Sequence, residues 1–177
     1  MTQARELNLV ELVDETGAAR GSATVLEAHA APGQLHRAFS VLLFDAAGRT
    51  LLQQRAAAKT RFPLRWANAC CGHPAPGTTL VEAAAERLVE ELGVTGVPLV
   101  EVGVYTYRAT DEASGRVEHE YDHVLVGQVG PSLTVAADPA EVAATRWAPA
   151  ADLVATGAEF APWLAGVLPL ALAARSR

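Results

Sequence analysis

Basic clusters and long apolar runs are absent from this sequence. Its 14 lysine and arginine residues are scattered among 20 acidic residues, which leaves a net charge of −6 and argues against a nucleic-acid surface. The longest apolar run, residues 161–174, is too short to span a bilayer. The mixed, acidic opening residues do not have the pattern of a secretory leader. We therefore expect a cytoplasmic protein that has neither a membrane nor a nucleic-acid partner.

Cysteine is also scarce, and the only two stand side by side in the stretch WANACCGHPAPG, residues 66–77. The Cα atoms of Cys70 and Cys71 can be only ~3.8 Å apart, which is below the usual range for a disulfide. We therefore expect no structural disulfide and at least one free thiol. The stretch fits either a buried strand end made of small residues or a reactive centre that combines a thiol with a metal ligand such as His73.

The composition is that of a folded domain. Hydrophobic residues make up 50% of the 177 residues and charged residues 19%, which is enough for a substantial core and too apolar for a disordered chain. No internal repeat or obvious linker interrupts the chain, so we expect one domain over residues 1–177. Strands mixed with a few helices, without regular alternation, predict an α+β fold in the form of a mixed α/β sandwich.

Local patterns predict the order of the elements. Residues 7–17 read as a strand closing on a turn, and residues 38–55 as a β-hairpin around residues 45–48. Residues 80–92 predict an amphipathic helix that Thr78 or Thr79 caps and Gly93 ends. Two long strands within residues 98–129 share the turn 111–115, and another strand covers residues 141–149. Residues 149–154 and 161–176 are predicted to be helical.

Glu118 and Glu120 stand two positions apart on a predicted strand, so their carboxylates point to the same face. Two like charges this close repel each other unless a cation lies between them. His29, His36 and His73 could supply nitrogen ligands to such a cation, and the whole set suits a divalent transition metal. The simpler alternative is a solvated strand face on which the two glutamates share no function.

The predicted helix carries a second motif. Its stretch ERLVEELGV approximates the end of the Nudix box, a glycine-led loop and helix that holds magnesium diphosphate. Counted back from Gly93, the box begins at Gly72 and has Glu90 and Glu91 as its paired acids. The usual Arg-Glu pair of the box is reversed at residues 86–87. An ordinary charged helix face is the alternative interpretation.

Longer stretches resemble the type I isopentenyl diphosphate isomerases, the metal-dependent branch that adopts the Nudix fold. The resemblance rests on HAAPGQLHRAFSVLLFD, LLQQRAAAKTRFPLRWANACCGHP, EAAAERLVEELGV and YRATDEASGRVEHEYDHV, and it covers residues 8–170 in order. It implies one Nudix-like domain with mixed sheets flanked by helices, a core at about residues 35–150, an N-terminal strand and C-terminal helices. It also implies the family reaction, which interconverts isopentenyl diphosphate and dimethylallyl diphosphate through a tertiary carbocation.

The resemblance assigns roles to individual residues. Cys71 and Glu120 are the implied acid/base pair, and Tyr107 is implied to assist Glu120 by hydrogen bonding. The implied ligands of a divalent transition metal, Mn²⁺ or Zn²⁺, are His29, His36, His73, Glu118 and Glu120. Those of a second ion, Mg²⁺, are Glu91 and Cys71, and the substrate-binding residues are Arg55, Lys59, Arg87 and Trp163. No flavin is implied, and we expect a monomer whose partner is a small prenyl diphosphate.

Val25 departs from the family pattern, because a lysine that contacts the diphosphate is usual four residues before the first metal histidine. Arg87 bears on the choice of reaction, since a Nudix hydrolase needs a carboxylate there to hold metal and water, whereas a cation clamps the diphosphate. Two alternatives to the isomerase stay open. One is a Nudix pyrophosphohydrolase, and the other is a prenyl-diphosphate-binding protein without turnover.

Overall fold

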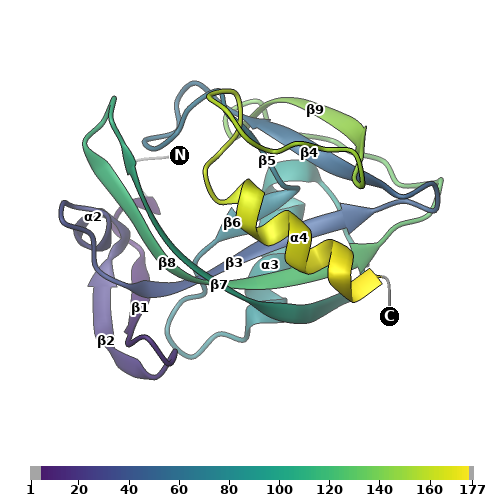
Figure 1. Cartoon of the computed structure of the whole chain (residues 1–177). Helices are drawn as coiled ribbons and strands as arrows, with labels where there is room; N and C mark the ends of the chain where they lie inside the picture. Colours follow the sequence, from purple (N-terminus) through teal and green to yellow (C-terminus); the bar gives the residue numbers. More distant parts are fainter. Residues whose placement is uncertain (1–4, 176–177) are drawn as a thin grey trace.

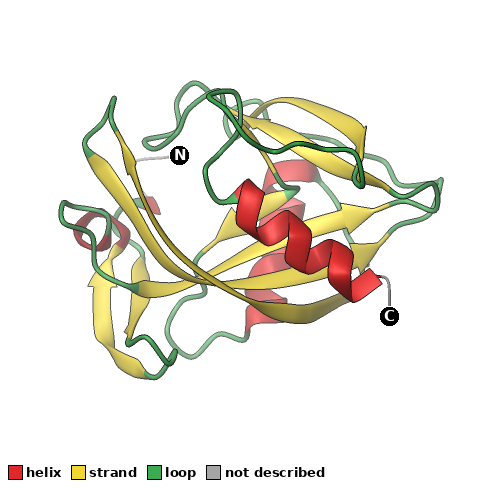
Figure 2. Ribbon diagram, in the orientation of Figure 1, coloured by secondary structure: helices red, strands yellow, loops and turns green. Residues whose placement is uncertain are grey.

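The computed structural model describes residues 5–175, in which strands outnumber helices (Figures 1 and 2). The strands are β1 (Leu9–Val13), β2 (Ala19–Thr24), β3 (His36–Phe44), β4 (Arg49–Arg55), β5 (Trp66–Ala67), β6 (Cys70–Gly72), β7 (Leu99–Asp111), β8 (Arg116–Gln128) and β9 (Val142–Pro149). The helices are α2 (Val25–Ala28), α3 (Leu80–Leu92) and α4 (Leu164–Arg175). In Figure 1, α4 lies in front of the sheet and α3 behind it. The predicted α+β fold, with helices flanking mixed strands, is confirmed.

The parallel pair β3–β8 brings together residues that are distant in sequence. Nine residue pairs join these strands, from His36–Glu120 to Phe44–Gln128. β7 pairs antiparallel with β8, as the two long predicted strands require. On the other side, β6 pairs antiparallel with β3, so that Cys71 lies opposite Ser40. The first half of β3 therefore lies between the segments that carry the two predicted acid/base residues.

The hairpin predicted around residues 45–48 forms, but its strands separate at once. Phe44 and Thr50 are the one pair that joins β3 to β4 within the described chain. β4 pairs instead with β9 along its length, and with the short β5. As a result, β3 carries His36 to one part of the site and β4 carries Arg55 to another.

α3 ends at Gly93 as its sequence predicts, and of the two N-caps that the sequence allows, Thr78 and Thr79, the structure has the second. Thr79 is the N-cap, and its side chain and that of Glu82 form a reciprocal capping box. Gly93 ends the helix in the left-handed conformation, with a φ angle of 64°. Leu88 and Leu92 are buried in one hydrophobic cluster with side chains of β3 and β8, which holds α3 against the sheet.

β2 and α2 precede the first candidate metal ligand. Nothing in the sequence predicts β2, whose residues ARGSAT are mostly exposed and include poor strand formers. It forms because it pairs antiparallel with β1. The one-turn helix α2 follows directly and is held by a capping box between Thr24 and Glu27. This short helix ends at His29, its C-cap, and thereby places that imidazole.

The C-terminal region corrects one prediction. Residues 149–154 are not helical, since Pro149 ends β9 and a turn follows it. The backbone N–H of Ala150 donates to the carbonyl of Gly48 at 3.2 Å, which ties this segment to the β3–β4 turn. A six-residue helix gains too few internal hydrogen bonds to compete with that contact. α4 begins at Leu164, later than predicted, and Ser176 lies outside the described residues.

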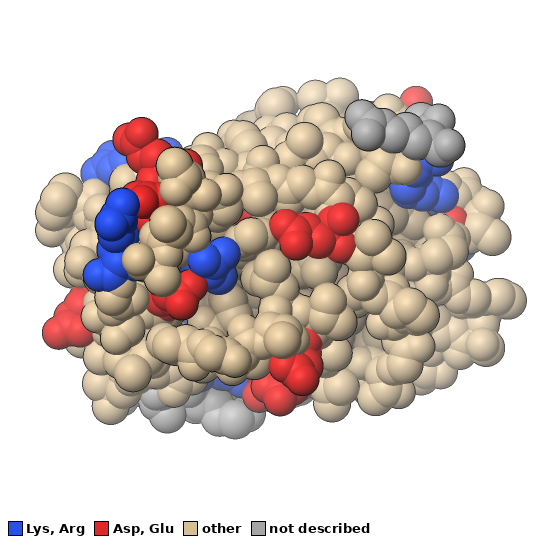
Figure 3. All heavy atoms as spheres, turned by 90° about the horizontal axis from the view of Figure 1, so that it is seen from below, with Lys and Arg blue, Asp and Glu red and all other residues tan. Residues whose placement is uncertain are grey.

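The apolar C-terminal run packs within the protein. α4 buries Leu164, Val167 and Leu168 in a second hydrophobic cluster, on the other side of the sheet from α3. Among the described residues, no helix is both long and apolar enough to cross a membrane. On the face seen in Figure 3, acidic and basic side chains are interspersed among uncharged ones.

Candidate active site

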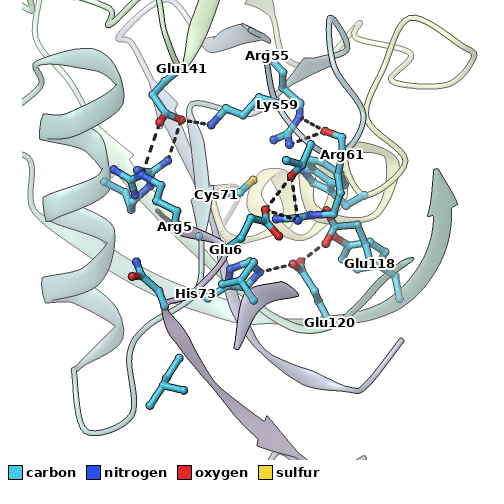
Figure 4. Close-up of a pocket in the computed structure, with 18 residues that line it drawn as sticks. Arg5, Glu6, Arg55, Lys59, Arg61, Cys71, His73, Glu118, Glu120 and Glu141 are labelled. Atoms are coloured by element: carbon cyan, nitrogen blue, oxygen red, sulfur yellow. Dashed lines mark hydrogen bonds and ion pairs between the residues drawn. The ribbon is translucent and has the colours of Figure 1, made fainter. Parts of the chain in front are cut away.

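One pocket gathers most of the residues that the sequence singles out (Figure 4). Of the twelve residues to which the resemblance assigns a role, nine line it: Arg55, Lys59, Cys71, His73, Arg87, Tyr107, Glu118, Glu120 and Trp163. The other three are buried in contact with these lining residues: His29, His36 and Glu91. Figure 4 shows basic side chains around Glu141 at one end of the pocket and His73, Glu118 and Glu120 at the other. The Cys71 sulfur lies between the two ends in this view.

Five candidate metal ligands converge at one end of the pocket. The donor atoms of His29, His36, His73, Glu118 and Glu120 all lie within 4.8 Å of one another. The Nε2 atom of His29 is 2.8 Å from a Glu118 oxygen, and that of His73 is 2.9 Å from a Glu120 oxygen. The β3–β8 register explains the convergence, because it sets His36 opposite Glu120 and leaves Glu118 two residues away on the same face.

Two of the imidazoles are oriented by the backbone. The Nδ1–H of His29 donates to the Val25 carbonyl at 2.7 Å, and that of His36 donates to the Gln34 carbonyl at 2.8 Å. These bonds turn both Nε2 atoms toward the carboxylates, as is usual for histidines that bind metals. The buried Nε2 atom of His36 has no hydrogen-bond partner. Three imidazoles and two carboxylates with an orphaned nitrogen among them fit a divalent metal ion.

The two carboxylates of the cluster stay ionised. Burial by itself would raise the pKa of Glu120, but the adjacent imidazoles of His36 and His73 hold that pKa well below its usual range. Burial likewise opposes ionisation of Glu118, whose pKa is nevertheless lowered by the neighbouring His29 and by Arg61. A pair of ionised, buried carboxylates is the arrangement that a divalent cation would stabilise.

Cys71 differs sharply from its neighbour Cys70. Cys70 is fully buried in the hydrophobic cluster under α3, whereas Cys71 is partly exposed and lines the pocket. The Sγ atom of Cys71 lies 3.4 Å from Ser40 Oγ and donates to Asn68 Oδ1 at 3.3 Å. Desolvation of the thiol, with the nearby Asp122, raises the pKa of Cys71 to about 12. The thiol is therefore protonated at neutral pH.

Tyr107 and Trp163 form an aromatic wall of the pocket. The Tyr107 hydroxyl donates to Glu120 at 2.7 Å, and burial together with the Glu120 charge raises the pKa of Tyr107 well above its usual range. Its ring centroid is 6.1 Å from that of Trp163, whose Nε1–H donates to Asn68 at 3.0 Å. The guanidinium carbon of Arg55 lies 5.3 Å from the centroid of the Trp163 ring. A cation is thus already accommodated over this ring.

The opposite end of the pocket is a charge cluster. Lys59 bridges the buried carboxylates of Glu91 and Glu141, and it lies 3.0 Å from Glu91. Arg87 pairs with Glu91 and lies 3.5 Å from Glu141. Gln53 donates to the second oxygen of Glu91 at 2.8 Å. Two cations predicted to bind diphosphate therefore share two carboxylates, one of which, Glu141, the sequence does not single out.

Two residues that hold the site together carry no signal that sequence reasoning could use: Arg61, which lines the pocket, and Asn68, which lies behind two of its lining residues. Asn68 hydrogen-bonds both Cys71 and Trp163 from a short loop between β5 and β6. Arg61 lies in a stretch that reads only as a basic loop, yet it bridges Glu6 and the candidate ligand Glu118. The contacts of Asn68 with Trp163 and of Arg61 with Glu6 and Glu118 join segments that are more than 50 residues apart, and no local spacing reveals them.

Val25 contributes no charge to the pocket. Its side chain lines the pocket but is only 6% exposed, because it packs with Val10 and Ala28. A cation that faces the diphosphate has to come from another part of the chain.

This chain is similar to a known domain family, to named enzymes and to solved structures. Residues 34–170 match the family described as NUDIX domain. The chain is 63% identical to isopentenyl-diphosphate Delta-isomerase of Nocardia farcinica over 169 residues, which are 93% of this chain and 95% of that protein. It is 49% identical to the protein of the same name from Streptomyces coelicolor over 168 residues, which are 94% of this chain and 84% of that protein. The crystal structure of DR0079 from Deinococcus radiodurans matches with a TM-score of 0.73 at 17% identity, covering 92% of this chain and 98% of that one, and shows the fold alone.

Proposed function

Because the chain belongs to the isopentenyl-diphosphate Delta-isomerases of the Nudix fold, we propose that it interconverts isopentenyl diphosphate and dimethylallyl diphosphate. The observation that carries this proposal is the presence in one pocket of a protonated thiol, Cys71, and an ionised carboxylate, Glu120. Moving a double bond by one position requires one group to add a proton at one carbon and another to remove a proton two carbons away. A pair in which one group is protonated and the other is ionised meets that requirement.

One turnover conserves the number of substrate protons, because one group of the pair gives up a proton and the other takes one up. Proton exchange with water then returns both groups to their starting states. In the forward direction, protonation of the terminal methylene carbon makes it a methyl group and leaves a tertiary carbocation. Loss of a proton from the carbon next to the diphosphate-bearing carbon then forms the new double bond. Tyr107 holds the Glu120 carboxylate by its 2.7 Å hydrogen bond and so orients the oxygen that exchanges the proton. The reverse reaction uses the same two groups in the opposite order.

Trp163 and Tyr107 suit the carbocation. Both rings line the pocket, and Trp163 is only 2% exposed, so that a cation over its face is screened little by water. A desolvated cation–π contact stabilises by ~2 kcal/mol or more. The guanidinium of Arg55 lies over the ring, which supports this face of Trp163 as a position for a cation. Substrate binding would draw Arg55 from the ring toward the diphosphate.

His29, His36, His73, Glu118 and Glu120 would hold the transition metal, for which Mn²⁺ and Zn²⁺ are the candidates. Bound there, such an ion would fix the Glu120 carboxylate and reduce its basicity. Arg55, Lys59 and Arg87 would bind the diphosphate, with Mg²⁺ held through Glu91 and Cys71. Because Mg²⁺ takes oxygen ligands, Cys71 would contribute a backbone oxygen and keep its thiol free for proton transfer. Lys59 and Arg87 now neutralise buried carboxylates, so a divalent ion would compensate Glu91 as both cations turn to the substrate.

Proton NMR of isopentenyl diphosphate incubated with the metal-loaded protein in deuterated water tests this proposal. Deuterium is expected in the methyl group of the product, at unchanged phosphate content. Release of phosphate or pyrophosphate instead would assign the pocket to the hydrolase alternative. Tight binding of the substrate with neither exchange nor release would assign it to a binding protein without turnover.

A further inference from the structure

Arg5, shortly before β1, lies in the pocket although its segment shows no functional signal in the sequence. It lines the same pocket as Lys59 and Arg87, and its side chain is 31% exposed. In Figure 4 its guanidinium lies beside Glu141 at the cationic end of the pocket. Val25, which also lines the pocket, is uncharged, so Arg5 adds positive charge that the neighbouring helix α2 does not supply there.

Two carboxylates hold Arg5 and Arg87 side by side. The same oxygen of Glu90 accepts from Arg5 at 2.9 Å and from Arg87 at 2.8 Å. Glu141 is also shared, since Arg5 lies 3.6 Å from one of its oxygens and Arg87 lies 3.5 Å from the other. The two guanidinium groups are therefore neighbours, and an anion bound by Arg87 is within reach of Arg5.

Arg5 donates its hydrogen bond to an exposed carboxylate, whereas the buried Glu141 lies 3.6 Å away, beyond hydrogen-bond distance. Its closest partner, Glu90, is 46% exposed, and exposed ion pairs contribute little to stability. The hydrogen-bond partner of Arg5 can therefore be exchanged at small cost. A diphosphate carries several negative charges and accepts two parallel hydrogen bonds from a guanidinium, so it is the stronger partner.

We propose that Arg5 is a further diphosphate-binding residue, which the N-terminal segment contributes next to Arg87. This inference rests on the proposed function, because it names a ligand of the same substrate. Arg5 acts on the diphosphate, away from the reacting carbons, so it binds the ground state and the transition state alike. Its loss therefore raises KM more than it lowers kcat.

Arg5→Gln and Glu90→Gln separate binding from a purely structural role. Both substitutions remove the Arg5–Glu90 ion pair, but only the first removes the cation. If Arg5 binds diphosphate, Arg5→Gln weakens the binding of inorganic pyrophosphate by about fivefold, and Arg5→Lys restores most of the loss. Glu90→Gln leaves pyrophosphate binding equal or tighter, because it frees both arginines from a competing carboxylate and leaves in place Glu91, the one acid of the pair that is proposed to hold Mg²⁺.

Titration calorimetry with inorganic pyrophosphate and Mg²⁺, at low and at high salt, measures the binding affinity of each variant without any turnover. The expected loss in Arg5→Gln shrinks at high salt because it is electrostatic, and KM for isopentenyl diphosphate rises in parallel. Equal weakening in Arg5→Gln and Glu90→Gln, or no weakening in Arg5→Gln, would overturn the inference. Failure of the unmodified protein to isomerise isopentenyl diphosphate would refute the proposed function separately, since it leaves the pyrophosphate comparison intact.

Discussion

Replacing Asn68 with alanine is expected to lower both stability and turnover. Asn68 is fully buried, and its side chain makes four hydrogen bonds. Its oxygen accepts from Trp163 at 3.0 Å and from Cys71 at 3.3 Å. Its amide nitrogen donates to the carbonyls of Val41 at 3.1 Å and Cys70 at 2.8 Å. One side chain thus orients the proposed reactive thiol and the ring proposed to face the carbocation.

The hydrogen bonds of Asn68 allow an estimate of the loss in stability and in turnover. The buried indole N–H of Trp163 loses its acceptor in Asn68→Ala, and an unsatisfied buried group costs ~1–3 kcal/mol. The missing amide also leaves a small cavity, and the carbonyls of Val41 and Cys70 lose one donor each. We expect the free energy of unfolding to fall by roughly 3 kcal/mol. Loss of the hydrogen bonds that fix the positions of Cys71 and Trp163 is expected to lower kcat by about a hundredfold.

Asn68→Asp is the matched control. It keeps an oxygen acceptor for Trp163 and Cys71 at the same position. It replaces the NH₂ group, which donates to the carbonyls of Val41 and Cys70, with a second carboxyl oxygen. It should therefore retain more turnover than Asn68→Ala, even where its stability is also reduced. Urea unfolding followed by circular dichroism gives the stability, and the NMR assay gives kcat. A loss of stability in Asn68→Ala with kcat within about threefold of the unmodified protein would refute the orienting role.

Other substitutions test the remaining assignments. Cys71→Ala should abolish isomerisation and leave the fold intact, whereas Cys70→Ala should keep most activity; the reverse result would make Cys70 the reactive thiol. His29→Ala should lower the bound transition metal to under about one tenth in elemental analysis, and an unchanged content would exclude the five-residue cluster as the metal site. Gly166→Ala should destabilise by ~1–3 kcal/mol, because a Cβ there would overlap the Tyr105 ring. This outweighs the gain in helix propensity of up to ~1 kcal/mol, and a rise in melting temperature would show that Tyr105 moves aside freely.

Where signals are local, the sequence was enough to predict the element. Thr79 and Gly93 mark the ends of α3 because a cap and a left-handed stop act within one turn of the helix. Residues 149–154 show where such reasoning stops. Their apolar pattern fits a helix, but the hydrogen bond from Ala150 to Gly48 joins them to a turn far back in the chain. The sequence of residues 149–154 by itself therefore cannot reveal that this segment is held in a turn.

The pocket likewise has some features that local motifs predict and others that depend on contacts between distant segments. The motifs around His29, Cys71 and Glu120 were sufficient, by family resemblance, to nominate the acid/base pair and the five metal ligands. The sequence by itself also determined the acidic net charge and the adjacent thiols. Only the tertiary structure decided that Asn68 lies between thiol and indole and that Arg5 stands beside Arg87. Asn68 meets Trp163, and Arg5 meets Glu90 beside Arg87, across more than 80 residues of chain, so no local or periodic pattern reveals these contacts. Protonation of the Cys71 thiol likewise depends on burial by other segments.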